Sequence, residues 1–119
     1  MEAQYTYDAR LVRVIDADTV VLDIDVGFSF EAKRMRLRLF GINAPEMNTV
    51  AGREATTFVS YWFVTHPRLV VRTIKDKTGA AKADSFGRYL AEVYAAGPED
   101  TASLSEILME AGHAVRYVP

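Results

Sequence analysis

A two-residue alternation of apolar and polar side chains in two neighbouring segments constrains the fold most strongly. In segment 33–40, Met35, Leu37 and Leu39 alternate with Arg34, Arg36 and Arg38. Segment 19–26 has the same pattern, with apolar residues at Val20, Leu22, Ile24 and Val26. A period of two predicts strands with one buried face. Segment 27–32 begins with glycine, which predicts a hairpin loop between the two strands.

The order of the remaining elements extends this hairpin into a barrel. Three more segments have strand composition, namely 5–15, 69–74 and 89–94. Apolar residues recur at helical spacing over 49–65, where Pro67 ends the helix, and a second helix is predicted from the cap at Ser103 to Gly112. Three strands, a helix, two strands and a helix are typical of the OB-fold. We therefore expect a mainly β (α+β) fold, a five-stranded OB-fold-like barrel with two or three helices.

Length, charge and composition narrow the class of protein. The 119 residues suit one domain, so we expect residues 1–119 to form a single unit. The absence of cysteine excludes disulfides and thiolate metal sites. A net charge of -2 argues against coating nucleic acid by bulk charge, although basic residues gather within 33–38 and 68–82. There is no long apolar run and no signal-peptide pattern, so we expect a cytoplasmic monomer that does not bind membranes.

Three short segments carry side chains suited to phosphodiester chemistry. They are VIDADT at 14–19, RLFGINAPE at 38–46 and DSFGR at 84–88. Carboxylates suit a hard, oxygen-preferring cation, and the arginine fork donates two hydrogen bonds to a phosphate. Each segment alone has an ordinary interpretation: a hairpin turn, a solvated strand face followed by a loop charge, or an exposed loop.

Together, and in this order, the three segments resemble the staphylococcal nuclease (thermonuclease) family. That family has a V-I-D-G-D-T-like turn, then R-L-x-G-I-D-A-P-E, then D-x-[YF]-G-R, and the similarity extends from about Leu11 to Tyr117. The resemblance implies the OB-fold independently of the strand count. It also implies a metal-dependent, micrococcal-nuclease-type endonuclease of low sequence specificity. Such an enzyme cuts single-stranded DNA, with RNA as a further substrate, and leaves 3′-phosphate ends. Short members of this kind occur in bacteria and phages.

The resemblance implies a role for each matching residue. The expected catalytic residues are Arg38 and Arg88, which grip the scissile phosphate, and Glu46, which positions or deprotonates the attacking water. The expected ligands of Ca²⁺, or of Mg²⁺ or Mn²⁺, are Asp18, Asn43 and the backbone carbonyl of Ala44. The expected nucleotide-binding aromatics are Phe86 and Tyr117, and the residues expected to support the site are Asp16 and Thr19.

The chain departs from the family pattern at three positions. Asn43 stands where the family usually has Asp, and losing one negative charge predicts weakened Ca²⁺ binding. Ala17 replaces the usual Gly, which predicts slight strain or a different turn. Ser85 replaces a commonly basic residue, which weakens the contact with phosphate.

Two other hypotheses compete with an active nuclease. The first is a catalytically weak or inactive relative that binds nucleic acid or protein, and the retention of Arg38, Glu46 and Arg88 argues against it. The second is an unrelated OB-fold protein for single strands, whose stacking platforms would be Tyr5, Tyr7, Phe28 and Phe30. Several residues have simpler interpretations: a solvated or phosphate-steering surface for Arg34 and Arg36, core for Trp62, and structural or surface positions for His66 and His113.

Overall fold

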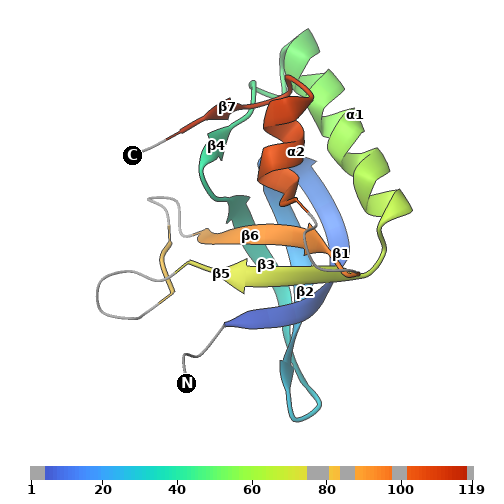
Figure 1. The fold of residues 1–119 in the computed structure, drawn as a ribbon, viewed down its shortest axis with the longest axis vertical. Coiled ribbons are helices and arrows are strands. Elements are labelled where there is room, and N and C mark those ends of the chain that lie inside the picture. The colour runs from blue at the N-terminus through green and yellow to red at the C-terminus, as the bar shows by residue number, and fades with distance from the viewer. Residues whose placement is uncertain (1–4, 75–80, 84–87, 98–101, 118–119) are drawn as a thin grey trace.

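Five strands close into a barrel in the computed structural model, which describes residues 5–74, 81–83, 88–97 and 102–117. The strands are β1 (Thr6–Asp16), β2 (Thr19–Gly27), β3 (Phe30–Leu39), β5 (Leu69–Thr73) and β6 (Tyr89–Ala95). Their order around the barrel is β1-β2-β3-β6-β5, with β5 pairing back onto β1 (Figure 1). β3 and β6 run parallel, whereas the other pairs are antiparallel. The predicted OB-fold-like barrel is confirmed.

The alternation in the sequence becomes the inside and outside of this barrel. Val20 pairs with Leu37, and both side chains are buried in the core. The next core pair along β2 is Leu22, fully buried, with Met35 of β3. Directly opposed residues of antiparallel strands share a face, so the residues between these positions, Val21 of β2 and Arg36 of β3, are directed outward. The register thus places one continuous apolar layer inside the barrel.

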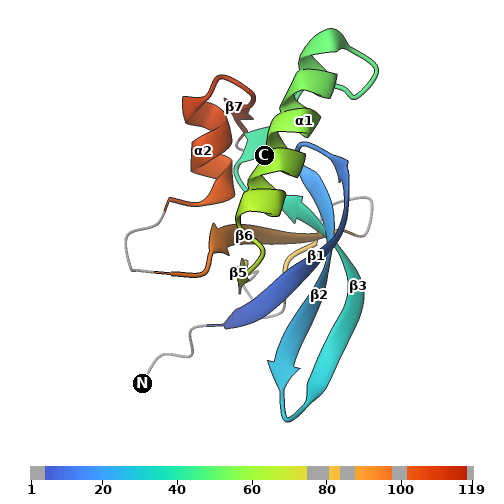
Figure 2. The same ribbon diagram turned by 90° about the vertical axis from the view of Figure 1, so that its right-hand side faces the viewer.

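Two helices cover one side of the barrel (Figures 1 and 2). α1 (Val50–Thr65) starts at the N-cap Thr49, whose hydroxyl accepts a hydrogen bond from the Gly52 N–H at 3.0 Å. Trp62 is buried on its inner face, as predicted. α2 (Leu104–Glu110) begins at Ser103, whose hydroxyl caps the Glu106 N–H at 3.2 Å. In the described part of the chain, no helix is long and apolar enough to cross a membrane.

The structure corrects the sequence prediction in two places. Segment 41–48, predicted as a loop, contains β4 (Ile42–Asn43), which pairs with β7 (Val115–Arg116) in a small second sheet. The predicted loop 27–32 is shorter, because β3 already begins at Phe30. The β2–β3 ladder shifts between Leu22 and Ile24, and Arg34, beside this bulge, has φ 53. The alternation is therefore interrupted there.

Candidate active site

The turn between β1 and β2 is anchored to the end of β3 and to β4. The Asp18 carbonyl accepts a hydrogen bond from the Leu39 N–H at 2.9 Å, and its carboxylate accepts one from the Ala44 N–H at 3.0 Å. The Asp16 carboxylate accepts the Asp18 N–H at 3.2 Å. Ala17 is fully buried and is not among the described residues with positive φ. The turn therefore does not require glycine, and the strain that Ala17 predicted is not found.

Arg38 lies at the end of β3, opposite Thr19 of β2. Its guanidinium donates hydrogen bonds to the Asn43 side-chain oxygen and, at 3.1 Å, to the Ile42 carbonyl. It also lies 3.8 Å from the Asp18 carboxylate, and its side chain is only 13% exposed. The Tyr117 ring centre is 5.7 Å from this guanidinium, within the range of a cation–π contact. Arg38 is thus held between β2, β4 and the residue that follows β7.

Arg88 approaches Thr19 from the start of β6. It directly precedes β6, and the parallel pairing of β6 with β3 sets Leu90 opposite Arg38. Arg88 donates a hydrogen bond to the Thr19 hydroxyl at 3.0 Å. Thr19 is therefore bordered by Arg38 across the ladder and by Arg88 through its hydroxyl. Two arginines from distant parts of the sequence thus lie near one buried threonine and line the same cavity.

Glu46 is held by the start of α1. Its backbone carbonyl accepts hydrogen bonds from the Thr49 N–H at 3.0 Å and from the Thr49 hydroxyl at 2.7 Å. Gly52 packs directly on this carbonyl, because a Cβ atom at Gly52 would lie 1.8 Å from the Glu46 oxygen. The Glu46 side chain is exposed, and its carboxylate makes no hydrogen bond or ion pair with the residues that the structure describes. The backbone is thus fixed, while the carboxylate faces solvent.

These side chains surround one cavity of about 330 Å³. Its lining residues are Asp16, Asp18, Arg38, Asn43, Ala44, Pro45, Glu46 and Arg88. All six residues predicted from the sequence as catalytic or metal-binding are among them. Tyr117 does not line the cavity but contacts Arg38 at its edge. Phe86 lies outside the described residues, so its predicted role is not located here.

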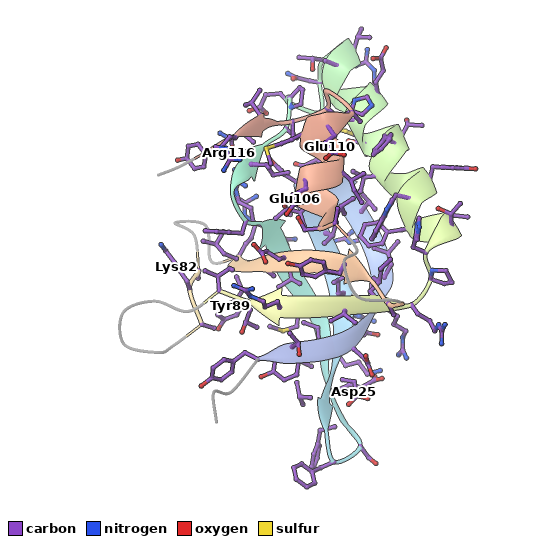
Figure 3. All side chains as sticks on the ribbon, in the orientation of Figure 1. Asp25, Lys82, Tyr89, Glu106, Glu110 and Arg116 are labelled. Carbon is purple, nitrogen blue, oxygen red and sulfur yellow. The ribbon has the colours of Figure 1, made fainter. Side chains whose placement is uncertain are left out.

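Further cations border the side of the molecule on which β6 begins. Figure 3 shows Lys82 and Arg116 on the same side as Tyr89, the first residue of β6. Arg116 pairs with Ile42 in the β4–β7 sheet, beside the cavity residue Asn43. Arg116 could not be predicted from the sequence, because a strand of two residues shows no pattern that indicates its pairing with β4.

The pKa values of the two aspartates of the turn, Asp16 and Asp18, are shifted in opposite directions. Burial, together with the neighbouring Asp18, raises the pKa of Asp16 to about 6. Burial also acts to raise the pKa of Asp18, but hydrogen bonds from Asp16 and the Ala44 N–H and the charge of Arg38 lower it below its ordinary value. Nearby groups therefore stabilise the charged form of Asp18 but not that of Asp16. A bound cation would favour the charged form of both.

The donor set of the cavity fits a hard divalent cation. Asp18 offers a carboxylate, Asn43 an amide oxygen and Ala44 a backbone carbonyl, and Ca²⁺ and Mg²⁺ prefer such oxygen ligands. Over the described ranges, no three His, Cys, Asp or Glu side chains form a metal-binding group.

Each of the two histidines packs against an aromatic ring. His66 stacks on Trp62 at 4.7 Å, and its Nδ1 lies 2.8 Å from the Trp62 carbonyl oxygen. His113 contacts Phe58 with ring centres 4.8 Å apart. Neither histidine lines this cavity, but His113 lines an adjoining cavity of about 240 Å³ that shares Asn43, Ala44 and Pro45 with it. The structural or surface role of the two histidines stays a prediction.

The protein is a closed OB-fold-like barrel with carboxylates and two arginines around one cavity. The family profile described as "Staphylococcal nuclease homologue" matches residues 36–118, and this chain belongs to that family. The VIDADT turn precedes the matched range, and the fold brings it to the other two motifs. The chain is also similar to the uncharacterized protein MJ1439 of Methanocaldococcus jannaschii, with 24% identity over 130 residues. That alignment covers 94% of this chain and 60% of the relative's length.

Proposed function

We propose that this protein is a metal-dependent nuclease that hydrolyses phosphodiester bonds in single-stranded DNA and in RNA with low sequence specificity. The observation that carries the proposal is the convergence of Arg38, Arg88 and Glu46 on one open cavity beside Asp18. Membership of the staphylococcal nuclease homologue family supports the same class of reaction. The proposal includes cleavage that leaves 3′-phosphate ends, in a cytoplasmic monomer.

In the proposed mechanism, the two arginines bind the scissile phosphate. Arg38 and Arg88 both approach Thr19 from the side of β3 and both line the cavity, so a phosphate above Thr19 can accept hydrogen bonds from both guanidinium groups. The charge that develops on the phosphoryl oxygens in the transition state strengthens these bonds, which lowers the barrier. Arg38 exchanges its contacts with Ile42 and Asn43 for the phosphate when substrate enters.

Glu46 acts on the water. Its carboxylate faces solvent at the cavity, where it can accept a proton from a water molecule aligned with the phosphorus atom. The water oxygen bonds to phosphorus, the bond to the 5′ oxygen breaks, and the leaving oxygen takes up a proton from solvent. The phosphate then remains on the 3′ oxygen of the other fragment.

A divalent cation belongs to this proposal. Asp18, Asn43 and the Ala44 carbonyl would hold it, with Ca²⁺ as the first candidate and Mg²⁺ and Mn²⁺ as alternatives. When bound, such an ion supplies positive charge to the phosphoryl oxygens and lowers the pKa of water. The amide of Asn43 reduces the negative charge of the site, so the proposed affinity is weaker than with a carboxylate.

The alternative function is a weak or inactive binding module of the same family. Asn43 favours it, because the amide reduces cation affinity and its oxygen accepts a hydrogen bond from Arg38. The unrelated single-strand-binding hypothesis has less support. Tyr7 packs partly buried against the core, whereas Phe28, 95% exposed, lies in the β2–β3 connection.

Substitution of both arginines separates the enzyme from the binding module. In Arg38→Gln/Arg88→Gln, we expect cleavage of denatured DNA to fall by about 10³-fold or more, since each transition-state donor contributes about 10²–10³. Binding of a single-stranded oligonucleotide in chelator should fall by only about tenfold. If the unmodified chain binds the strand but cuts none with any of the three cations, the binding module is the correct function.

A further inference from the structure

A second pair of arginines lies on β1 and β3 beside the proposed scissile position. The register sets Val21 of β2 opposite Arg13 of β1 on one side and opposite Arg36 of β3 on the other. Directly opposed residues of antiparallel strands direct their side chains to the same face. The core residue Val20 adjoins Val21 and points inward, so Arg13, Val21 and Arg36 share the outer face.

The burial of Val21 supports this arrangement. Val21 is only 5% exposed, yet it does not belong to the interior core cluster. Long arginine side chains cover neighbouring apolar surface with their aliphatic stems and keep the guanidinium in water. The register places the stems of Arg13 and Arg36 on either side of Val21, where they can cover it, and both arginines remain exposed.

No carboxylate neutralises these two arginines within the described part of the chain. Neither Arg13 nor Arg36 forms an ion pair or side-chain hydrogen bond there. Farther along the same strands the charges are balanced, since Arg10 lies 3.2 Å from Asp23 and Lys33 also contacts Asp23 and Glu31. Uncompensated positive charge on this face is thus concentrated around Val21.

This pair lies two residues along β2 from the proposed catalytic arginines. Arg38 and Arg88 border Thr19, and Arg36 and Arg13 border Val21. Residues two apart on a strand lie about 7 Å from each other on one face. The two flanking strands are separated by about 10 Å, a gap that two long arginine side chains can close around one phosphate with paired hydrogen bonds.

We propose that Arg13 and Arg36 form a subsite for the backbone phosphate next to the scissile one. The ligand is a single strand of nucleic acid that runs along the outer face of β2. This inference rests on the proposed function for the position of the scissile phosphate at Thr19. With this subsite, kcat/KM should be higher for substrates that have a neighbouring phosphate than for substrates with only the phosphate that is cut.

A binding experiment tests the subsite without catalysis. The probe is a fluorescein-labelled thymidine dodecamer, whose affinity is measured by anisotropy in chelator over a range of salt concentrations. We expect Arg13→Gln/Arg36→Gln to weaken binding about fivefold to tenfold and to reduce the slope of log K against log salt by about 0.7 for one phosphate contact. Arg13→Lys/Arg36→Lys keeps the charge and should retain most of the affinity.

The matched control is Arg68→Gln, which removes an exposed arginine between α1 and β5, outside this face. We expect it to change affinity less than twofold, and circular dichroism should show that all variants are folded. Equal losses in Arg68→Gln and in the double glutamine variant would overturn the subsite.

Cleavage of short substrates distinguishes failure of the subsite from failure of the proposed function. A thymidine dinucleotide contains only the phosphate to be cut, whereas a trinucleotide has a neighbour. The double glutamine variant should lower kcat/KM for the trinucleotide about fivefold to tenfold and leave the dinucleotide unchanged. Equal effects on both would overturn the subsite but not the nuclease. If the unmodified chain cuts neither, the proposed function fails, and the binding experiment still decides the subsite.

Discussion

Gly52→Ala is expected to impair catalysis through the backbone of Glu46. Gly52 lies in the first turn of α1, and an added Cβ would be 1.8 Å from the Glu46 carbonyl oxygen, 2.5 Å from its carbon and 2.9 Å from the Pro45 oxygen. All three are backbone atoms, so no side-chain rotation relieves the contact. Helix and loop must separate by roughly 1.5 Å to restore ordinary contact distances.

The expected loss follows from this displacement. Misplacing a reacting group by about 1 Å costs about 10²-fold in rate, so kcat for single-stranded DNA should fall by about 100-fold. Alanine in place of glycine within a helix contributes about 1 kcal/mol of stability, but overpacking costs about 1–3 kcal/mol. The net change in the free energy of unfolding should therefore be a loss of at most about 2 kcal/mol.

The assay compares initial cleavage rates and urea unfolding for two alanine variants. Gly112→Ala is the control, because Gly112 has φ +80 and no atom within 4 Å of an added Cβ. Left-handed backbone costs alanine about 1–2 kcal/mol, so its stability loss should match while its kcat stays near that of the unmodified chain. If Gly52→Ala retains full kcat, or if both variants lose activity equally, the reasoning is refuted.

Three further predictions concern the cavity. Asn43→Asp should raise Ca²⁺ affinity about tenfold in calorimetry, because charge count tunes oxygen sites, and an unchanged affinity would contradict the proposed ligand. The pKa of Asp16 is raised to about 6, so the folded state binds a proton that the unfolded chain releases near pH 4. The Asp16 carboxylate therefore costs stability above about pH 6 and none well below pH 4. In chelator, Asp16→Asn should stabilise the protein at pH 7 by about 1 kcal/mol, a value reduced because solvent reaches the carboxylate. The variant should lose this advantage at pH 3. Equal effects on the free energy of unfolding at both pH values would exclude the linkage. Tyr117→Ala should raise KM for an oligonucleotide about tenfold through lost base stacking and leave Ca²⁺ affinity unchanged; an unaltered KM would remove Tyr117 from the substrate site.

Sequence periodicity was sufficient to predict the barrel but not its small second sheet. The alternation around Val20 and Leu37 predicted two long strands, and the structure pairs these residues in the core. β4 and β7 contain two residues each, too few to show any period. Their pairing depends on the distant approach of segment 115–116 to segment 42–43, which no local pattern encodes.

The candidate site was predictable in its residues but not in its contacts. The three motifs predicted six of the cavity residues, because their side-chain chemistry and order match a family. The hydrogen bond from Arg88 to Thr19 joins residues 69 positions apart and depends on barrel closure. The close approach of Gly52 to Glu46 could not be predicted either, because the sequence does not show which backbone atoms lie beside a helical glycine.

Release of acid-soluble nucleotides from denatured DNA is the direct test of whether the protein is a metal-dependent nuclease. The protein would be assayed with Ca²⁺ and with chelator, beside Glu46→Gln, which keeps the size of the side chain but removes the proposed base. The proposed nuclease function predicts calcium-dependent release by the unmodified chain and a loss of about 10²-fold or more in the variant. No release with Ca²⁺, Mg²⁺ or Mn²⁺, or equal release by Glu46→Gln, would contradict it.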